Sequence, residues 1–216
     1  MRLAVLALVG SLLVCAQAPR PKSGQIPWDQ IYLSPDGKVP VNPSALVLES
    51  TASLKPGTAL DVGMGNGRNA IYLARKGWKV VGIDSSEAAI KQAQAGAAKL
   101  GAQIDARKIR FEDLRIGAAE YDLILCMYVN DLAVKQARKI ITALKPNGLL
   151  IVEDYHADAA FANLKPDPPQ TGYRTNELLR AFNDLRILRY EDRPAQAEWS
   201  NGPDGRAPLV RLVARK

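Results

Sequence analysis

The sequence has little cysteine and little histidine. It holds 2 cysteines and 1 histidine among its 216 residues. Cys15 lies in an apolar N-terminal segment, and loss of that segment would leave Cys126 as a single thiol that cannot form an internal disulfide. The chain also lacks a run of the ~20 apolar residues that a membrane-spanning helix needs. These absences exclude a disulfide-stapled miniprotein and a spanning helix.

Blocks of like charge are also missing. The 29 Lys and Arg residues are scattered among 22 Asp and Glu residues, and the formal net charge is +7. This distribution is typical of a solvated surface and disfavours nucleic acid as a partner. The composition, 47% hydrophobic and 24% charged, fits a globular chain with a buried core, and the length predicts about one domain.

The first residues differ in pattern from the rest of the chain. Met1-Arg2 is followed by 13 mostly apolar residues from Leu3 to Cys15 and then by Ala16-Gln17-Ala18. This order predicts a secretory signal peptide over residues 1–18, with an uncleaved N-terminal helix as the alternative. Export would place the protein in the periplasm or outside the cell. A retained leader would give at most loose membrane association, because it is too short to span.

A proline-rich segment separates this leader from the folded part. Residues 19–41 are predicted to form an extended N-terminal arm. The alternative is that Trp28, Ile31 and Tyr32 fold back as a lid. Residues 42–216 are then expected to form the folded domain.

Strand-like and helix-like segments alternate from residue 58 onward. The expected strands cover residues 58–62, 79–83, 104–111, 121–128 and 149–153, and the expected helices cover residues 43–53, 68–76, 87–100 and 132–144. This alternation predicts an α/β fold with a doubly wound, mostly parallel, Rossmann-like sheet covered on both faces. After a helix near residues 178–182, strands at 185–190 and 209–214 flank a run of turn formers and predict an antiparallel C-terminal hairpin.

A glycine-rich segment lies where the first strand meets the following helix. It reads Asp61-Val62-Gly63-Met64-Gly65-Asn66-Gly67-Arg68-Asn69, at the edge where open α/β sheets bind ligands. A dinucleotide fingerprint requires its third glycine at position 68, which is arginine here. Asp61 would repel a pyrophosphate and attract a cation. The segment therefore favours a positively charged nucleoside ligand over NAD, with Asp61, Gly63, Met64, Gly65, Asn66, Gly67, Arg68 and Asn69 as candidate binding residues.

Further candidates lie at the ends of the next strands. Asp84, followed by Ser85, ends the second strand, where an acid can accept both ribose hydroxyls. Asp113 and Leu114 follow the third strand, where a carboxylate could accept an adenine amino hydrogen. The candidate cofactor-binding residues beyond the glycine segment are thus Asp84, Ser85, Asp113 and Leu114, together with Cys126 and Met127 at the end of the fourth strand.

With residues 61–67 as motif I, the chain from residue 58 to 216 resembles the class I S-adenosylmethionine-dependent methyltransferases. The resemblance implies S-adenosylmethionine as cofactor, the strand order 3-2-1-4-5-7-6 with strand seven antiparallel, and Asp84 and Asp113 as the ribose-side and adenine-side acids. Residues 65–74 are similar to the tellurite-resistance methyltransferases. Two positions depart from that pattern: Met64 replaces the usual cysteine, and Glu198-Trp199-Ser200 stands where members place a substrate-side histidine.

The segment after the fourth strand narrows the acceptor. It reads Cys126-Met127-Tyr128-Val129-Asn130-Asp131 and lacks the Asn/Asp-Pro-Pro-Tyr motif of enzymes that methylate nucleic-acid bases or glutamine. A magnesium cluster cannot be assembled from Asp131 and Asp154, so no metal is expected. The prediction is a small-molecule acceptor with a soft or already acidic nucleophile.

His156, just past the fifth strand, is the candidate catalytic base for an oxygen or nitrogen acceptor. The alternative is an exposed loop histidine, because the sequence shows no partner for it. The predicted function is S-adenosylmethionine-dependent methyl transfer to a small molecule. A non-catalytic S-adenosylmethionine- or nucleoside-binding protein of the same fold is the alternative. Cofactor supply predicts a cytoplasmic protein, in conflict with the export that the leader predicts.

Overall fold

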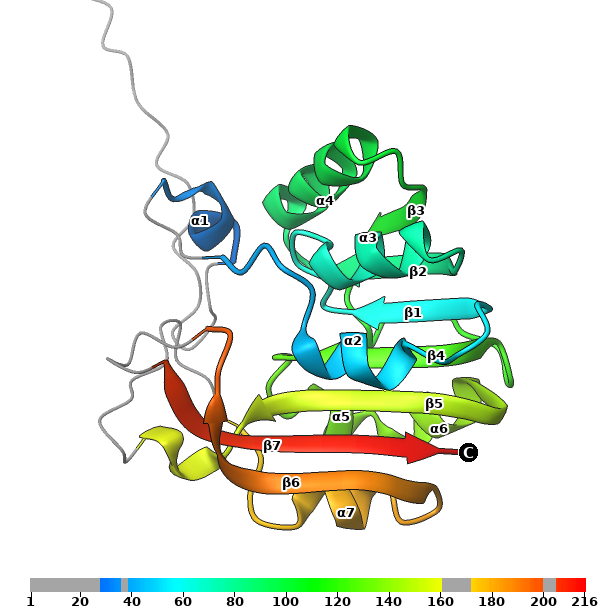
Figure 1. The fold of residues 1–216 in the computed structure, drawn as a ribbon, viewed down its shortest axis with the longest axis vertical. Coiled ribbons are helices and arrows are strands. Elements are labelled where there is room, and N and C mark those ends of the chain that lie inside the picture. Colours follow the sequence, from blue (N-terminus) through cyan, green and yellow to red (C-terminus); the bar gives the residue numbers. More distant parts are fainter. Residues whose placement is uncertain (1–27, 36–38, 161–171, 200–204) are drawn as a thin grey trace, which may run out of the picture.

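A computed structural model describes residues 28–35, 39–160, 172–199 and 205–216 of the chain, and these contain one seven-stranded sheet in the order β3-β2-β1-β4-β5-β7-β6 (Figure 1). The strands are β1 (Thr58–Val62), β2 (Lys79–Asp84), β3 (Ile104–Lys108), β4 (Tyr121–Met127), β5 (Leu144–Tyr155), β6 (Arg186–Gln196) and β7 (Arg206–Arg215). Strands β1 to β5 pair in parallel, whereas β7 is antiparallel to both β5 and β6. The predicted fold class, strand order and C-terminal hairpin are confirmed.

Helices cover both faces of this sheet (Figure 1). One face carries α2 (Ala45–Thr51), α3 (Arg68–Arg75) and α4 (Glu87–Lys99), and the other carries α5 (Leu132–Lys135), α6 (Ala137–Ala143) and α7 (Glu177–Ala181). Alternate residues of β4 pack into the two hydrophobic cores, one on each face of the sheet. Leu123 and Leu125 pack on the face that carries α2 to α4, and Ile124 and Cys126 pack on the face that carries α5 to α7. A strand buried on both faces needs a continuous apolar run, which explains why the sequence revealed it.

The helix α1 (Trp28–Leu33) occupies the segment that was predicted to be an extended arm. It lies beside α4, at the end of the sheet toward which β1 and β5 point (Figure 1). The extended-arm prediction is therefore wrong for these residues, and the lid alternative agrees with their position. The predicted signal peptide, residues 1–18, lies outside the described residues. Within the described part of the chain, no helix has the length and apolar character needed to cross a membrane.

The third strand ends earlier than predicted. β3 stops at Lys108 instead of residue 111, because its one neighbour, β2, ends at Asp84, which is the residue paired with Lys108. The chain then turns, and the Leu114 amide donates to the Arg110 carbonyl at 3.2 Å. Asp113 consequently lies in a turn and not at a strand end.

Three other boundaries also differ from the sequence-based expectation. The helix predicted over residues 132–144 is divided at Gln136 into α5 and α6. β5 begins at Leu144, paired with Tyr121, and a register shift before Leu123 accommodates the turn-like residues that follow. The helix expected at residues 43–53 is the shorter α2, preceded by Ser44. Ser86 caps α4, with its Oγ accepting from the Ala89 amide at 3.1 Å.

Candidate functional site

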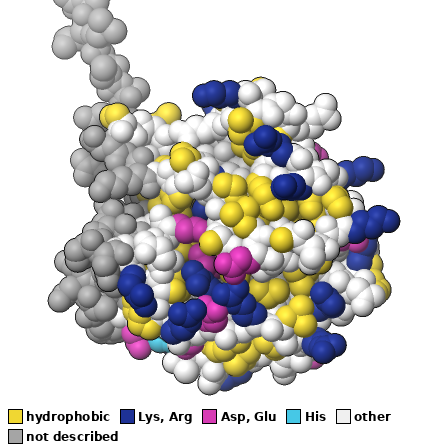
Figure 2. Space-filling view, viewed as in Figure 1, with side chains coloured by type: hydrophobic (Ala, Val, Ile, Leu, Met, Phe, Trp, Pro, Cys, Tyr) yellow, Lys and Arg dark blue, Asp and Glu magenta, His cyan; other side chains and the backbone are white. Residues whose placement is uncertain are grey.

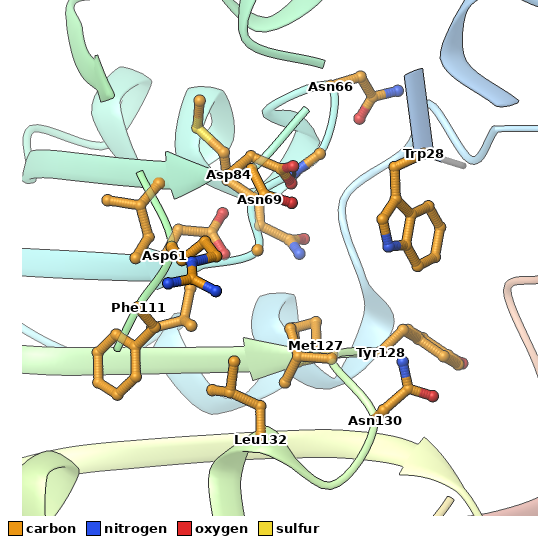
Figure 3. Close-up of a pocket in the computed structure, with 18 of the residues that line it drawn as sticks. Trp28, Asp61, Asn66, Asn69, Asp84, Phe111, Met127, Tyr128, Asn130 and Leu132 are labelled. Carbon is orange, nitrogen blue, oxygen red and sulfur yellow. Dashed lines mark hydrogen bonds between the residues drawn. The ribbon is translucent and has the colours of Figure 1, made fainter. Parts of the chain in front are cut away.

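A cavity of about 260 Å³ opens at the carboxyl ends of β1, β2 and β4 (Figure 3). Its wall combines the turn after β1, the end of β2, the segment after β3 and the loop after β4. Open α/β sheets bind ligands at this edge. Most of the predicted cofactor residues line the cavity: Asp61, Gly63, Met64, Gly65, Asn66, Arg68, Asn69, Asp84, Ser85 and Met127.

Two glycines of the turn after β1 serve different purposes. Gly65 has φ +58°, and a Cβ on it would lie 2.3 Å from the Tyr32 hydroxyl oxygen. Gly67 has φ +78° and is not among the lining residues; a Cβ there would meet the Ala93 side chain at 2.8 Å. The missing Cβ of Gly65 therefore lets the Tyr32 hydroxyl approach the turn that lines the cavity. The missing Cβ of Gly67 lets α3 pack against α4. Gly67, a predicted binding residue, thus does not line the cavity.

The carboxylate of Asp84 organises the same turn. Its Oδ2 accepts from the Gly65 amide at 2.9 Å, and its Oδ1 accepts from the Ser86 amide at 2.8 Å. Burial raises the pKa of the Asp84 carboxyl, and these hydrogen bonds oppose the effect. A carboxylate has about four lone-pair sites, so Asp84 keeps acceptor capacity for ligand hydroxyls.

Asp61 is the unusual group of the cavity. Its side chain is 1% exposed, and its Oδ2 has no hydrogen-bond partner among the described residues. Burial raises the pKa of the Asp61 carboxyl to about 7, although the nearby Arg68 opposes this rise. A buried carboxylate oxygen without a partner is costly, and a cationic ligand group would satisfy it. The site therefore fits a ligand that carries positive charge next to a nucleoside, as S-adenosylmethionine does.

Three side chains of the glycine turn also hold the segment that leads from α1 to α2. Asn66, Arg68 and Asn69 line the cavity and hydrogen-bond to residues 40–44 at the same time. Asn66 Nδ2 donates to the Pro40 carbonyl at 2.9 Å, Arg68 Nη1 donates to the Asn42 carbonyl at 2.9 Å, and the Ser44 amide donates to Asn69 Oδ1 at 2.8 Å. These predicted cofactor residues thus tie the N-terminal segment to the cavity.

An aromatic wall closes part of the cavity, and the set of predicted cofactor residues did not include it. Trp28 and Tyr32 of α1 line the cavity together with Trp199 and Tyr128. The Trp28 ring centroid lies 6.3 Å from that of Trp199 and 6.5 Å from that of Tyr32. The signal available in the sequence was the four-residue spacing of Trp28 and Tyr32, which places both on one side of a helix.

Asp113 does not line the cavity. Its side chain is 53% exposed, and its Oδ2 accepts from Arg110 Nε at 2.8 Å. The neighbouring residues Arg110, Phe111 and Glu112 line the cavity instead. The prediction for Asp113 failed because it assumed a longer β3.

Leu114 and Cys126 are core residues. Both belong to the hydrophobic cluster on the face of the sheet that carries α5, α6 and α7, and neither lines the cavity. Burial raises the pKa of the Cys126 thiol, so it is a neutral, apolar side chain. The predicted ligand contacts of these two residues are therefore corrected.

His156 is buried and partnered, contrary to the alternative of an exposed loop histidine. It is 8% exposed, and its Nε2 lies 3.1 Å from Thr175 Oγ1. Its Nδ1 accepts from the Asp158 amide at 3.1 Å. His156 does not line the cavity, so the structure gives no support to the prediction that it is the catalytic base.

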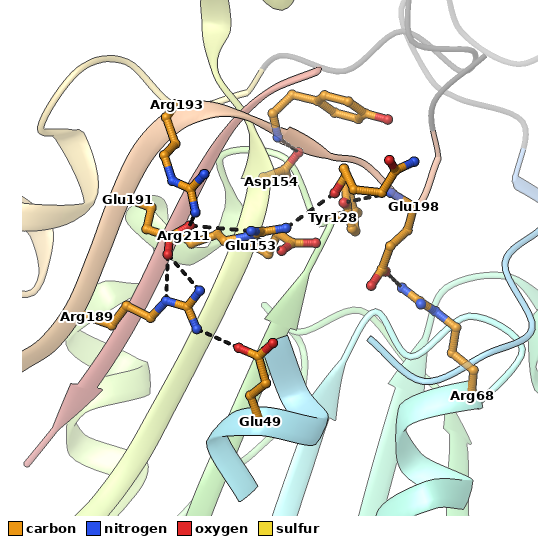
Figure 4. A network of polar contacts seen from close by, with 12 residues as sticks. Glu49, Arg68, Tyr128, Glu153, Asp154, Arg189, Glu191, Arg193, Glu198 and Arg211 are labelled. Atoms are coloured by element: carbon orange, nitrogen blue, oxygen red, sulfur yellow. Dashed lines mark hydrogen bonds and ion pairs between the residues drawn. The ribbon is translucent and has the colours of Figure 1, made fainter. Parts of the chain in front are cut away.

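A network of charged side chains crosses β5, β7 and β6 (Figure 4). Arg211 Nε donates to Glu153 Oε2 at 2.5 Å, and Arg211 Nη1 donates to Glu191 Oε2 at 3.4 Å. Glu191 also pairs with Arg189, which reaches Glu49 of α2 at 2.8 Å. Charges of both signs gather between α2 and the hairpin on the molecular surface (Figure 2). Nearer the cavity, Figure 4 shows the separate pair of Arg68 with Glu198.

Comparison with known proteins agrees with this geometry. Residues 59–148 match the family described as a methyltransferase domain. A ubiquinone biosynthesis O-methyltransferase of Hahella chejuensis is 36% identical over 89 residues, covering 40% of this chain and 37% of that protein. An uncharacterized methyltransferase of Synechocystis is 28% identical over 158 residues, covering 70% of this chain and 63% of that protein. The chain thus spans less than two thirds of either relative.

Solved structures share the fold. TehB from Haemophilus influenzae superposes with a TM-score of 0.65 and 21% identity, covering 79% of this chain and 61% of that one. An S-adenosylmethionine-dependent methyltransferase from Methanosarcina mazei gives a TM-score of 0.63 and 17% identity, covering 78% and 96%. At 21% and 17% identity, these matches show a shared fold, the one that the resemblance to class I methyltransferases implies.

Proposed function

Because this chain has the class I methyltransferase fold and carries the methyltransferase domain over residues 59–148, we propose that it transfers a methyl group from S-adenosylmethionine to a small-molecule acceptor. The observation that carries the proposal is Asp61, a buried carboxylate whose Oδ2 has no partner among the described residues and which faces a cavity lined by the glycine turn. The phosphate of an anionic nucleotide placed beside that carboxylate would be repelled by it.

The residues of the cavity suit distinct parts of the cofactor. Asp84 would accept the ribose hydroxyls, and Asp61 would face the cationic part of the molecule. When bound, the sulfonium supplies an electrophilic methyl group. The chain's own task is to align the acceptor with that group and to exclude water. The aromatic wall of Trp28, Tyr32 and Trp199 supports the second task.

For the acceptor, we propose a soft or already acidic nucleophile. The lining residues that the structure describes include no histidine, lysine or cysteine, and the carboxylates of Asp61 and Asp84 are assigned to the cofactor, so few groups are left to act as a general base. The name of the Hahella chejuensis relative, a ubiquinone biosynthesis O-methyltransferase, makes an oxygen nucleophile the first acceptor to test. A thiol or an inorganic selenium or tellurium oxyanion is the next.

Turnover with methyl-labelled S-adenosylmethionine tests this function. The purified protein is incubated with a panel of small phenols, thiols, selenite and tellurite, and label transfer is followed for each. We expect transfer to at least one acceptor and no specific binding of NAD. Tight cofactor binding without transfer to any acceptor would favour the non-catalytic alternative instead.

Substitution of Asp84 tests the ribose assignment. We expect Asp84→Ala to weaken S-adenosylmethionine binding by about 1.5–3 kcal/mol, because a charge-assisted hydrogen bond is lost. Asp113→Ala removes the same charge outside the cavity and should change the affinity by less than about twofold. Calorimetry measures both. Equal losses in the two variants would contradict the assignment.

Cofactor affinity should depend on pH through Asp61. Its pKa of about 7 means that the carboxyl is protonated below that value and cannot attract a cation. Affinity should therefore fall on acidification, by at most about tenfold per pH unit below that pKa, and level off above it. Asp61→Asn should bind weakly with a flat profile over the same range. Calorimetric titrations at several pH values measure this, and a flat wild-type profile would refute it.

The role of the N-terminal residues is a separate proposal. We propose that residues 1–18 are a signal peptide that is removed on export. The requirement for a cofactor made in the cytosol argues for the opposite location. N-terminal sequencing of protein from a native-like host decides between them, because an intact Met1 in the soluble extract would refute export.

A further inference from the structure

α1 needs support from the rest of the protein to keep its place over the cavity. It has six residues, too few for a helix that is stable on its own. Tyr32 packs on Ala88 and Ala89 of α4, with Trp28 at the margin of the same small cluster. Polar contacts with α4 must therefore contribute much of the interaction that holds α1 in its position.

Asp29 makes the most specific of these contacts. Its Oδ1 accepts from the Ser86 hydroxyl at 2.6 Å and from the Ala88 amide at 3.0 Å. The Ser86 hydroxyl itself accepts from the next amide, that of Ala89, so the two side chains satisfy successive amides at the start of α4. Hydrogen bonds from Ser86 and Ala88 lower the pKa of Asp29, which is thus ionised at neutral pH and favourably placed at the positive end of the helix.

Asp29 and Asp84 both accept hydrogen bonds from Ser86. The Ser86 amide donates to Asp84, and the Ser86 hydroxyl donates to Asp29. A second tether holds the other end of α1, where Gln92 Nε2 donates to the Tyr32 carbonyl at 2.5 Å. α1 is therefore held at the start of α4, where Ser86 also binds Asp84. The Tyr32 hydroxyl lies beside Gly65.

We propose that Asp29 is a positioning residue: by capping α4 from α1, it holds Trp28 and Tyr32 over the cavity and thereby sets how tightly the cofactor and the acceptor are enclosed. This inference rests on the proposed function. Asp29 itself is exposed and does not line the cavity, so it acts through the two aromatic residues and not on a ligand.

Variants of Asp29 in the full chain test the proposal. Loss of a capping side chain costs about fivefold in the equilibrium that docks α1, so Asp29→Ala should raise the Kd for S-adenosylmethionine by up to about fivefold. The acceptor KM should rise similarly while kcat stays within about twofold, since saturating ligands restore the docked state. Asp29→Asn keeps an acceptor oxygen and should recover most of the affinity. Asp105→Ala, an exposed carboxylate paired with Arg107 on β3, is the charge-matched control and should behave as wild type.

Amide hydrogen exchange without any ligand supplies a readout that does not depend on catalysis. In Asp29→Ala, the Ala88 amide should exchange faster, while the Ala89 amide stays protected by Ser86. Unchanged exchange at Ala88 would overturn the proposal, and so would full cofactor affinity in Asp29→Ala. Wild-type protein that binds no S-adenosylmethionine would overturn the proposed function instead, whatever the exchange result at Ala88.

Discussion

Replacing Gly65 with alanine should lower kcat/KM for methyl transfer by about 100-fold, the loss that a misplacement of about 1 Å can cause at a reacting centre. A Cβ at this position would lie 2.3 Å from the Tyr32 hydroxyl oxygen, so Tyr32 and the turn must separate. That movement opens the wall between α1 and the glycine turn. S-adenosylmethionine affinity, measured by calorimetry, should fall as well.

Gly101→Ala is the matched control for this substitution. Gly101 has φ +62°, close to the φ +58° of Gly65, but a Cβ on it would meet no atom within 4 Å. Both variants therefore bear the same left-handed backbone cost of about 1–2 kcal/mol, and only Gly65→Ala adds the clash with Tyr32. Only Gly65→Ala should lose activity. Equal activity in the two variants would show that the turn does not form the cofactor wall.

The second large effect concerns stability. Arg211→Met should destabilise the fold by about 3–5 kcal/mol, because it leaves the buried carboxylate of Glu153 without its ionic partner. Glu153 is 1% exposed, and burial already raises its pKa. The destabilisation should be greatest at neutral and higher pH and should shrink on acidification, because protonation removes the unpaired charge. Denaturant unfolding at several pH values measures both features.

Two variants separate this mechanism from a general loss of packing. Arg193→Met removes an exposed partner of Glu191 and should cost less than about 1 kcal/mol. The double variant Arg211→Met with Glu153→Gln removes both charges and should recover much of the lost stability. A double variant no more stable than Arg211→Met would mean that the packing of the Arg211 side chain, and not its charge, stabilises this part of the sheet.

The sequence by itself determined the sheet and the place of the ligand cavity. Apolar runs such as Tyr121–Met127, bounded by turn formers, favour strands covered on both faces, and the glycine turn after β1 lies at the ligand-binding edge of such a sheet. Asp61 and Asp84 were found because a strand and its own terminal residue are local in the sequence. These features follow from hydrophobic periodicity and from turn-forming residues. Both can be recognised within a stretch of about ten residues.

Only the tertiary structure decided which predicted side chains stay away from the cavity and which unpredicted ones line it. β3 ends where its partner β2 ends, and this removed Asp113 from the site, although nothing between residues 104 and 113 marks the boundary. α1 lies over the cavity in contact with α4, where Asp29 meets Ser86, 57 residues further along the chain. His156 is a buried, partnered residue because Thr175 lies beside it, 19 residues away. Each of these outcomes depends on a partner brought close by folding, and such a partner has no signature in the local sequence.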